Sequence, residues 1–244
     1  MNNGRKFAVF DIDGTLIRWQ LYHALADELV RQGHLNATQF EKVRAARMEW
    51  KKRSNSDAFA AYEQTLVELV DEGITGIKVA DLQRACRSVI AEYKDQVYTY
   101  TRDLMRDLRA QNYLLFAISA SQMEIVQLFA EYYELDDYGG SIYEVKNGTF
   151  TGQKTILKSE QKPKYLEQLV ARNGAVWDGS IAVGDSEGDI PMLEKVEQPI
   201  AFNPTKKLFA HARTKRWPIV VERKNMMYRL EPTDGSYLLA ETDD

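Results

Sequence analysis

Phe7-Ala8-Val9-Phe10-Asp11-Ile12-Asp13-Gly14-Thr15-Leu16 is the stretch from which the fold of this chain can be argued. Its four leading apolar residues predict a strand that is buried on both faces, as strands of parallel sheets are. Side chains two positions apart on an extended chain point the same way, so Asp11 and Asp13 can face one small volume just past the strand. Gly14 then lets the chain turn away without a side chain that fills this volume.

Two carboxylates this close together need compensation. At a separation of about 4 Å and an effective dielectric constant of about 20, two like unit charges repel by about 4 kcal/mol. A bound cation, or a proton shared between the two groups, must offset this repulsion. The stretch therefore predicts a site and not only a strand end.

The composition is that of a globular protein without a bias toward polyanionic partners. The 244 residues suit one large domain, or a core with a smaller inserted domain. The 32 basic and 36 acidic residues give a net charge of −4, so neither nucleic acid nor an anionic membrane is expected as a general partner. The single cysteine, Cys86, excludes an internal disulfide and a cysteine-based zinc site, and we expect it to be a buried residue of a helix.

Targeting signals are not evident. The N-terminal residues lead directly into the strand without a secretory apolar region, and no apolar run has the length that a bilayer crossing needs. A cytoplasmic location is the resulting expectation. Nothing in the pattern indicates an oligomeric state.

A wholly helical segment is predicted after the first strand. Apolar residues recur there at helical spacing, which predicts helices over Leu21 to Gly33, Ala37–Arg53, Ser56–Asp71 and Val79–Val97. Asn36 or Thr38 could cap the second helix, and Ser56 or Asp57 the third. Because no strand is predicted in this segment, we expect residues 18–96 to form a helical cap domain. Residues 1–17 and 97–244 would then form a discontinuous α/β core.

From Thr101 onward, helices and strands alternate. The predicted helices are Arg102–Ala110, Met123–Tyr133 and Pro163–Arg172, and the predicted strands are Tyr113–Ile118, Ser180–Val183, Pro199–Phe202 and Ile219–Val221. Asn147-Gly148 predicts a hairpin between Ser141–Val145 and Thr149–Thr151, and Asp234-Gly235 predicts a second one in the tail. Strands separated by helices predict a Rossmann-like parallel sheet with right-handed crossovers. The expected fold class is therefore α/β, with a helical cap inserted.

Polar side chains follow three of the buried strands at the point where each ends. These side chains are Asp11, Ser119 and Asp185, and Asp189 lies about one helical turn after Asp185. In open parallel sheets, ligands bind beyond the carboxyl ends of the strands, so we expect these groups to meet. Asp185 would ligate a metal and Asp189 would orient it, although helix capping by acids is the alternative for this pair. Hard oxygen ligands without nearby cysteine or histidine favour Mg²⁺ over zinc.

These motifs together resemble the haloacid dehalogenase-like phosphohydrolase superfamily over Phe7 to about Asn203. Asp11-Ile12-Asp13-Gly14-Thr15-Leu16 is similar to its first motif, Ile118-Ser119-Ala120-Ser121 to its second, Lys162 to its third, and Gly184-Asp185 through Leu193 to its fourth. The helical insert and the segment Tyr143 to Gly152 resemble the phosphoserine phosphatase-like subfamily IB. A single motif would be a weaker signal than four in this order.

The resemblance implies a specific chemistry. Asp11 would attack phosphorus and form an aspartyl-phosphate, while Asp13 would act as general acid and then as general base. Mg²⁺ would be held by Asp11, Asp185 and the backbone carbonyl of Asp13. Ser119 would donate to a phosphoryl oxygen and Lys162 would balance charge, although Lys154, Lys158 and Lys164 are nearby and a solvated lysine is the alternative. The implied activity is that of a Mg²⁺-dependent phosphomonoesterase acting on a small phosphorylated metabolite.

Substrate choice is expected to come from the cap and from the second motif. Gln20 occupies the position at which phosphoserine phosphatases carry an acid for the substrate ammonium, and Ala120-Ser121 replace a Gly-Gly pair, so phosphoserine is only one candidate. Arg44 and Arg47, with Lys51, Lys52 and Arg53, either form a solvated helix face or receive a second anionic group of the substrate. Trp19, Tyr22 and Trp50 either belong to the core or line an apolar pocket.

Two other functions stay open from the sequence. A binding or regulatory protein could keep this fold without turnover, and a phosphotransferase could pass the phosphoryl group to an acceptor other than water. The first would not bind Mg²⁺ and a phosphoryl mimic together. The second differs from a phosphatase only in its product.

Overall fold

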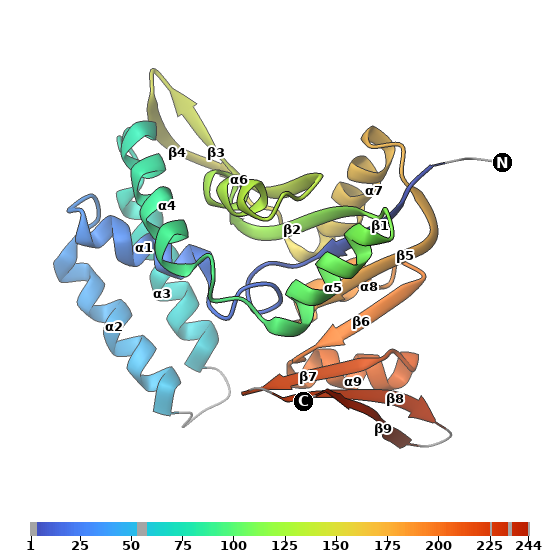
Figure 1. The fold of residues 1–244 in the computed structure, drawn as a ribbon. Coiled ribbons are helices and arrows are strands. Elements are labelled where there is room, and N and C mark those ends of the chain that lie inside the picture. The colour runs from blue at the N-terminus through green and yellow to red at the C-terminus, as the bar shows by residue number, and fades with distance from the viewer. Residues whose placement is uncertain (1–3, 53–57, 225, 234–235, 244) are drawn as a thin grey trace.

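The computed structural model describes residues 4–52, 58–224, 226–233 and 236–243, and a nine-stranded sheet runs through it (Figure 1). The strands lie in the order β4-β3-β2-β1-β5-β6-β7-β8-β9. Their bounds are β1 Lys6–Phe10, β2 Leu114–Gln122, β3 Asp137–Lys146, β4 Thr149–Thr155, β5 Val176–Gly184, β6 Gln198–Phe202, β7 Ile219–Arg223, β8 Met226–Thr233 and β9 Ser236–Asp243. The first strand of the chain therefore lies in the middle of the sheet.

The central strands are parallel, as the alternation of helices and strands predicts. β1 pairs in parallel with β2 and β5, with Phe10 opposite Ala117 in one and Val183 in the other. β3, β6 and β7 extend this parallel part, whereas β4, β8 and β9 pair antiparallel. This register brings the carboxyl ends of β1, β2 and β5 to the same edge.

Helices cover both faces of the sheet. They are α5 Thr99–Ala110, α6 Met123–Tyr132, α7 Lys162–Arg172, α8 Ile190–Leu193 and α9 Lys206–Lys215, with short 3-10 turns at Ser159–Gln161 and Glu187–Asp189. Ala8 and Phe10 pack into the apolar cluster that includes α5 and α6, while Phe7 and Val9 pack into the cluster that includes α7, α8 and α9. All four side chains are fully buried, so the prediction of a strand buried on both faces is confirmed.

The segment between β1 and α5 is helical, as predicted. It contains α1 Leu21–Arg31, α2 Ala37–Lys52, α3 Ala58–Gly73 and α4 Val79–Tyr93, gathered beyond the carboxyl end of β1 (Figure 1). Asn36 caps α2, because its Oδ1 accepts hydrogen bonds from Thr38 N at 2.9 Å and Gln39 N at 3.1 Å. Arg53, Ser56 and Asp57 lie outside the described residues. The division into a cap of residues 18–96 and a core stays a prediction.

The predicted end of the fourth helix is wrong. α4 ends at Tyr93, and Val97 instead forms an antiparallel bridge with Ile17. Arg18 N donates to Gln96 O at 2.8 Å, and Tyr98 N donates to Leu16 O at 3.1 Å. The chain therefore leaves the sheet and returns to it along two hydrogen-bonded crossings.

Two hairpins extend the sheet at its edges. Asn147 and Gly148 both have positive φ, 51° and 78°, as the Asn-Gly turn predicts. β8 and β9 pair antiparallel in the tail, although the Asp234-Gly235 turn itself lies outside the described residues. Over the part of the chain that the structure describes, no helix combines the length and the apolar composition that a membrane crossing requires.

Candidate active site

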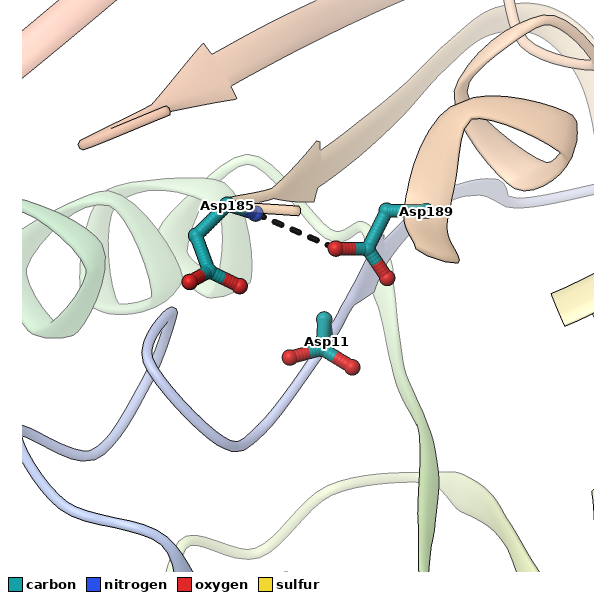
Figure 2. A group of neighbouring side chains, drawn as sticks. All are labelled: Asp11, Asp185 and Asp189. Atoms are coloured by element: carbon teal, nitrogen blue, oxygen red, sulfur yellow. Dashed lines mark hydrogen bonds between the residues drawn. The ribbon is translucent and has the colours of Figure 1, made fainter. Parts of the chain in front are cut away.

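Three carboxylates meet beyond the carboxyl ends of β1 and β5. Asp11 continues the pairing of these strands, since its N donates to Val183 O at 3.0 Å. Asp11, Asp185 and Asp189 each offer one oxygen, and these oxygens lie within 4.8 Å of one another (Figure 2). Asp11 is 7% exposed and Asp189 is fully buried. The expected convergence of side chains far apart in the sequence is therefore present.

Two glycines make room for this cluster. Gly14 has φ of +88°, and a Cβ there would lie 2.4 Å from Asp185 Oδ2. At Gly184 an added Cβ would lie 2.5 Å from the Cβ of Asp189. Since a side chain at either position would collide with a cluster carboxylate, glycine is required at both.

Lys162 is the cation inside the cluster. Its Nζ donates to Asp11 Oδ1 at 2.8 Å and to Asp189 Oδ1 at 2.6 Å, and the residue is 5% exposed. It begins α7, with Pro163 in the first turn. Of the other lysines that the sequence left open, Lys154 pairs with Asp71 and Lys164 is exposed. The structure thus brings Lys162 to Asp11, as its motif predicts.

Asp189 orients the loop after β5. Its Oδ2 accepts hydrogen bonds from Asp185 N at 3.2 Å, drawn in Figure 2, and from Ser186 N at 3.0 Å. Its Oδ1 accepts from Lys162. Because both oxygens already have protein donors, Asp189 is suited to hold Asp185 and Lys162 in place, which agrees with the orienting role expected from its spacing.

Asp13 faces a different set of partners. Its Oδ1 accepts from Leu21 N at 2.6 Å, at the start of α1. Its Oδ2 accepts from Ser119 Oγ and from Ser121 Oγ, both at 2.8 Å. A carboxylate at a helix N-terminus is stabilised by the unpaired amides there. The side chain of Asp13 is therefore turned to α1 and β2. The metal contact that the sequence predicts for Asp13 concerns its backbone carbonyl and stays a prediction.

The electrostatics of the cluster call for a further cation. Burial and the charge of Asp189 raise the pKa of Asp11 well above its usual range, against the opposing effect of Lys162. Burial and Asp189 also raise the pKa of Asp185, to about 7. Burial would lower the pKa of Lys162, but Asp11 and Asp189 raise it, so the lysine stays charged. Three carboxylates facing one ammonium, with oxygen donors only, fit a divalent ion such as Mg²⁺.

The pKa of Asp13 also lies above its usual range. Burial raises it, while the hydrogen bonds from Leu21, Ser121 and Ser119 oppose the shift. A carboxyl group that is raised in pKa and held by hydroxyls can both donate and accept a proton. Asp13 therefore lies beside the carboxylate cluster and Asp11 lies inside it, and the pKa of each is raised.

The residues expected to choose the substrate are only partly near this site. Ser121 is buried against Asp13, and Gln20 is half-buried directly before α1. Ala120 has an exposed side chain, and its carbonyl accepts from Ser141 Oγ at 2.6 Å. These three stay predictions, with Ser121 shown to contact Asp13.

Arg44 and Arg47 have partners within the helical segment. Arg44 is exposed and pairs with Glu41 at 3.2 Å, as a solvated helix face would. Arg47 donates to Asp27 Oδ2 and to Tyr62 Oη, each at 2.9 Å, and its side chain is 16% exposed. The structure does not bring these arginines to Asp11, because α2 packs mainly on α3 and α1. Their role in substrate binding stays a prediction.

An aromatic cluster occupies the inside of the helical segment. His23 lies against Tyr62 with ring centroids 4.9 Å apart, and Trp50 stacks on Tyr62 at 5.7 Å. Burial and the charge of Arg47 lower the pKa of His23 to about 3, so this histidine is neutral. Trp50 therefore belongs to the packing of the helices. Cys86 is buried, with a thiol pKa that burial raises to about 12, as expected for a structural residue.

One side chain at the site and one in the helical segment were not predicted from the sequence. Thr15 Oγ1 donates to Asp185 Oδ1 at 3.4 Å, and its place in the first motif is the signal that could have identified it. Glu63, in α3, has a pKa that desolvation and the negative charge of Asp13 raise. No sequence signal marks Glu63, because its relation to Asp13 depends on how α3 packs.

Comparison with known proteins gives a consistent result. The family model described as haloacid dehalogenase-like hydrolase matches residues 8–194. A histidinol-phosphatase from Neisseria meningitidis is 22% identical over 231 residues, which cover 88% of this chain and 98% of that protein. A phosphoserine phosphatase from Archaeoglobus fulgidus is 25% identical over 83% of this chain, which spans only 54% of that protein.

A solved structure shares the fold. The structure described as a phospho-aspartyl intermediate analogue of phosphoserine phosphatase matches with a TM-score of 0.60 and 21% identity. The match covers 91% of this chain and 95% of the other. At this level of identity, the likeness concerns the arrangement of helices and strands.

Proposed function

Because the chain belongs to the haloacid dehalogenase-like hydrolase family, we propose that it is a Mg²⁺-dependent phosphomonoesterase that forms an aspartyl-phosphate on Asp11. The observation that carries this proposal is the cluster in which Lys162 joins Asp11 to Asp189, beside Asp185. A buried nucleophile, a fixed ammonium and carboxylates that could hold a divalent ion suit phosphoryl transfer, because its catalysis is mainly positioning and charge stabilisation.

Asp11 is the proposed nucleophile. Lys162 holds its Oδ1, so we assign the attack to Oδ2. The Oδ2–P bond forms while the bond from phosphorus to the ester oxygen breaks, and the departing alkoxide takes a proton from Asp13. Water then attacks phosphorus and gives a proton to Asp13, while the bond between phosphorus and Oδ2 of Asp11 breaks. Phosphate is released and the carboxylate of Asp11 is restored.

Asp13 is suited to both proton transfers. Burial raises its pKa, which makes it a better proton donor than an ordinary carboxylate, and three donors fix its orientation. In the proposed mechanism Ser119 turns to a phosphoryl oxygen when substrate binds, while Leu21 N and Ser121 continue to hold Asp13.

Asp11 and Asp185 would hold the metal, together with the backbone carbonyl of Asp13. When bound, Mg²⁺ would supply positive charge against the carboxylates and the phosphoryl oxygens. Asp189 and Thr15 would act on Asp185, since Asp189 Oδ2 accepts from the Asp185 amide and Thr15 Oγ1 donates to its carboxylate.

The proposed substrates are phosphate esters of small amino alcohols. The two named relatives act on histidinol phosphate and phosphoserine, and both molecules carry an ammonium on the carbon next to the phosphorylated CH₂ group. Gln20 cannot supply a negative charge for this ammonium. We assign this charge to Glu63 of α3, whose pKa is raised by desolvation and by the negative charge of Asp13.

The test is phosphate release from a panel that contains histidinol phosphate, phosphoserine and 4-nitrophenyl phosphate. The proposal predicts Mg²⁺-dependent release that EDTA abolishes, with a preference for the amino-alcohol esters. Adding alcohol acceptors and analysing their products separates hydrolysis from phosphotransfer. Release that survives both EDTA and Asp11→Asn would refute the proposal, and no release with any ester, with no thermal stabilisation by Mg²⁺ and beryllium fluoride, would favour a silent binding protein.

A further inference from the structure

We propose that Glu222, in β7, is a positioning residue for Asp13, an inference that rests on the proposed function. Glu222 holds both crossings between the sheet and the helical segment, and through them the residues that follow Asp11. It lies beyond residues 8–194, which the family model matches. The catalytic motifs therefore do not include it.

Glu222 is buried and has three polar contacts. Its side chain is 3% exposed, and its Oε1 accepts a hydrogen bond from Nη2 of Arg18. Its Oε2 accepts from Tyr100 N at 2.9 Å, in the first turn of α5. Its own amide donates to Asn203 Oδ1 at 2.8 Å. The carboxylate thus joins the outgoing crossing, through Arg18, to the start of the helix that follows the returning crossing.

The outgoing crossing leads from Glu222 to Asp13. Arg18 Nε donates to Val97 O at 3.0 Å, and its guanidinium lies 5.3 Å from the centre of the Tyr98 ring. Three residues after Arg18, Leu21 N donates to Asp13 Oδ1 at 2.6 Å. Because so few residues separate these contacts, the position of Arg18 limits where the amide of Leu21 can lie.

The returning crossing leads to the same loop. Thr101, next to Tyr100, is fully buried, and its Oγ1 donates to Thr15 O at 2.9 Å. Thr15 in turn donates through Oγ1 to Asp185 Oδ1 at 3.4 Å. Glu222 holds the amide of Tyr100, and Thr101 and Thr15 connect this part of the chain to Asp185 in the carboxylate cluster.

A loss of this contact should be selective. Asp13 protonates the leaving group in the proposed mechanism, so its misplacement slows esters with poor leaving groups. 4-nitrophenolate leaves without a proton, so formation of the aspartyl-phosphate from its ester depends much less on Asp13, although hydrolysis of that intermediate needs Asp13 with either ester. A general weakening of the fold would reduce both rates together.

The first measurement is kcat/KM, which covers the steps up to departure of the leaving group, for an alkyl phosphate and for 4-nitrophenyl phosphate in Glu222→Gln and Arg18→Gln. We expect each variant to lose about tenfold with the alkyl ester and less than about twofold with the nitrophenyl ester. The losses should be less than additive in the double variant, because both single variants remove the contact between Arg18 and Glu222. Glu167→Gln, which breaks an exposed ion pair with Lys195, is the matched control and should lose neither activity.

The second measurement is amide hydrogen exchange, which needs no turnover. Glu222→Gln should speed exchange in peptides that contain residues 16–21 and 96–101, with exchange in β1 and β5 unchanged. Equal losses with the two esters, or exchange at the crossings that matches the wild type, would overturn the proposal. A wild-type protein without phosphatase activity would overturn the catalytic role of Glu222 together with the proposed function, and exchange would still report whether its carboxylate holds the crossings.

Discussion

Replacing Lys162 by Met tests the electrostatic account of the carboxylate cluster. The change removes the ammonium that donates to Asp11 Oδ1 and Asp189 Oδ1 and leaves a side chain of similar length. Burial and the neighbouring carboxylates already raise the pKa of Asp11, and Lys162 is the group that opposes this rise. Without Lys162, the carboxylates of the folded protein either keep uncompensated negative charge or become partly protonated.

The size of the effect follows from the burial of the pair. Removing one partner of a buried ion pair costs about 3–5 kcal/mol. For 244 residues, an unfolding entropy of about 2.1 cal/mol/K per residue converts this into a Tm lower by about 6–10 °C. The loss should be larger at pH 8 than at pH 5, because a raised folded-state pKa disfavours the charged carboxylate and protonation relieves it.

The assay is thermal unfolding of the variant at both pH values, with EDTA and with Mg²⁺. Mg²⁺ should restore part of the stability of Lys162→Met at pH 8, since it supplies positive charge to the same carboxylates. Lys164→Met, an exposed lysine in the same helix, is the control and should change Tm by less than about 2 °C. A Lys162→Met protein as stable as the control at pH 8 in EDTA would show that the ammonium does not compensate the carboxylates.

Four further predictions concern the metal site, the substrate and the cap. Because Asp185 has a pKa raised to about 7, a proton competes with Mg²⁺, and the affinity for Mg²⁺ measured by calorimetry should be about 25-fold weaker at pH 5.5 than at pH 7.5. In EDTA the same raised pKa makes the folded state gain stability as pH falls from about 7 toward 4, and a stability that instead falls over this range would contradict it. Glu63→Gln should lower kcat/KM about tenfold for amino-alcohol phosphates and leave 4-nitrophenyl phosphate within about twofold; equal effects on both would exclude an ammonium contact. Arg47→Met should lower Tm, since it strips Asp27 and Tyr62 of a partly buried partner, without changing KM; a KM that rises while Tm stays constant would instead place Arg47 at the substrate.

Local patterns were sufficient to predict the site because it is built at strand ends. The sequence of β1 predicts a strand that is buried on both faces. In the sheet Phe10 lies opposite Ala117 of β2 and Val183 of β5, so the residues that follow these three strands must meet. The Asn147-Gly148 turn was predictable for the same local reason, since both residues accept positive φ. Asp11 and Asp185 followed from their positions at strand ends, whereas Lys162 came from the resemblance to the third motif of the family.

The partners of each group were not predictable in the same way. Ser119 and Ser121 both donate to Asp13, although the second motif predicts contacts with a phosphoryl oxygen and a substrate. Nothing local to Ser121 reports the direction of the Asp13 side chain, which the start of α1 sets. Glu222 is further still from any motif, because its contact with Arg18 spans 204 positions in the sequence.

The end of α4 shows how tertiary pairing overrides a helical pattern. The apolar spacing continues to Val97, but the helix ends at Tyr93 and Val97 pairs with Ile17. An antiparallel bridge between two crossings produces no hydrophobic periodicity within either short segment. Such a feature depends on pairing between segments far apart in the sequence, and residues 93–97 alone do not encode it.

An aspartyl-phosphate on Asp11 is detected by the mass of the peptide that carries this residue after acid quenching during turnover. Asp13→Asn protein with 4-nitrophenyl phosphate should release about one equivalent of nitrophenol in a burst, because the leaving group needs no proton but hydrolysis of the intermediate needs a base. We predict one phosphoryl group on Asp11 in this sample and none in Asp11→Asn. Turnover of the wild type with no such adduct in Asp13→Asn, or with the phosphoryl group on another residue, would contradict the account.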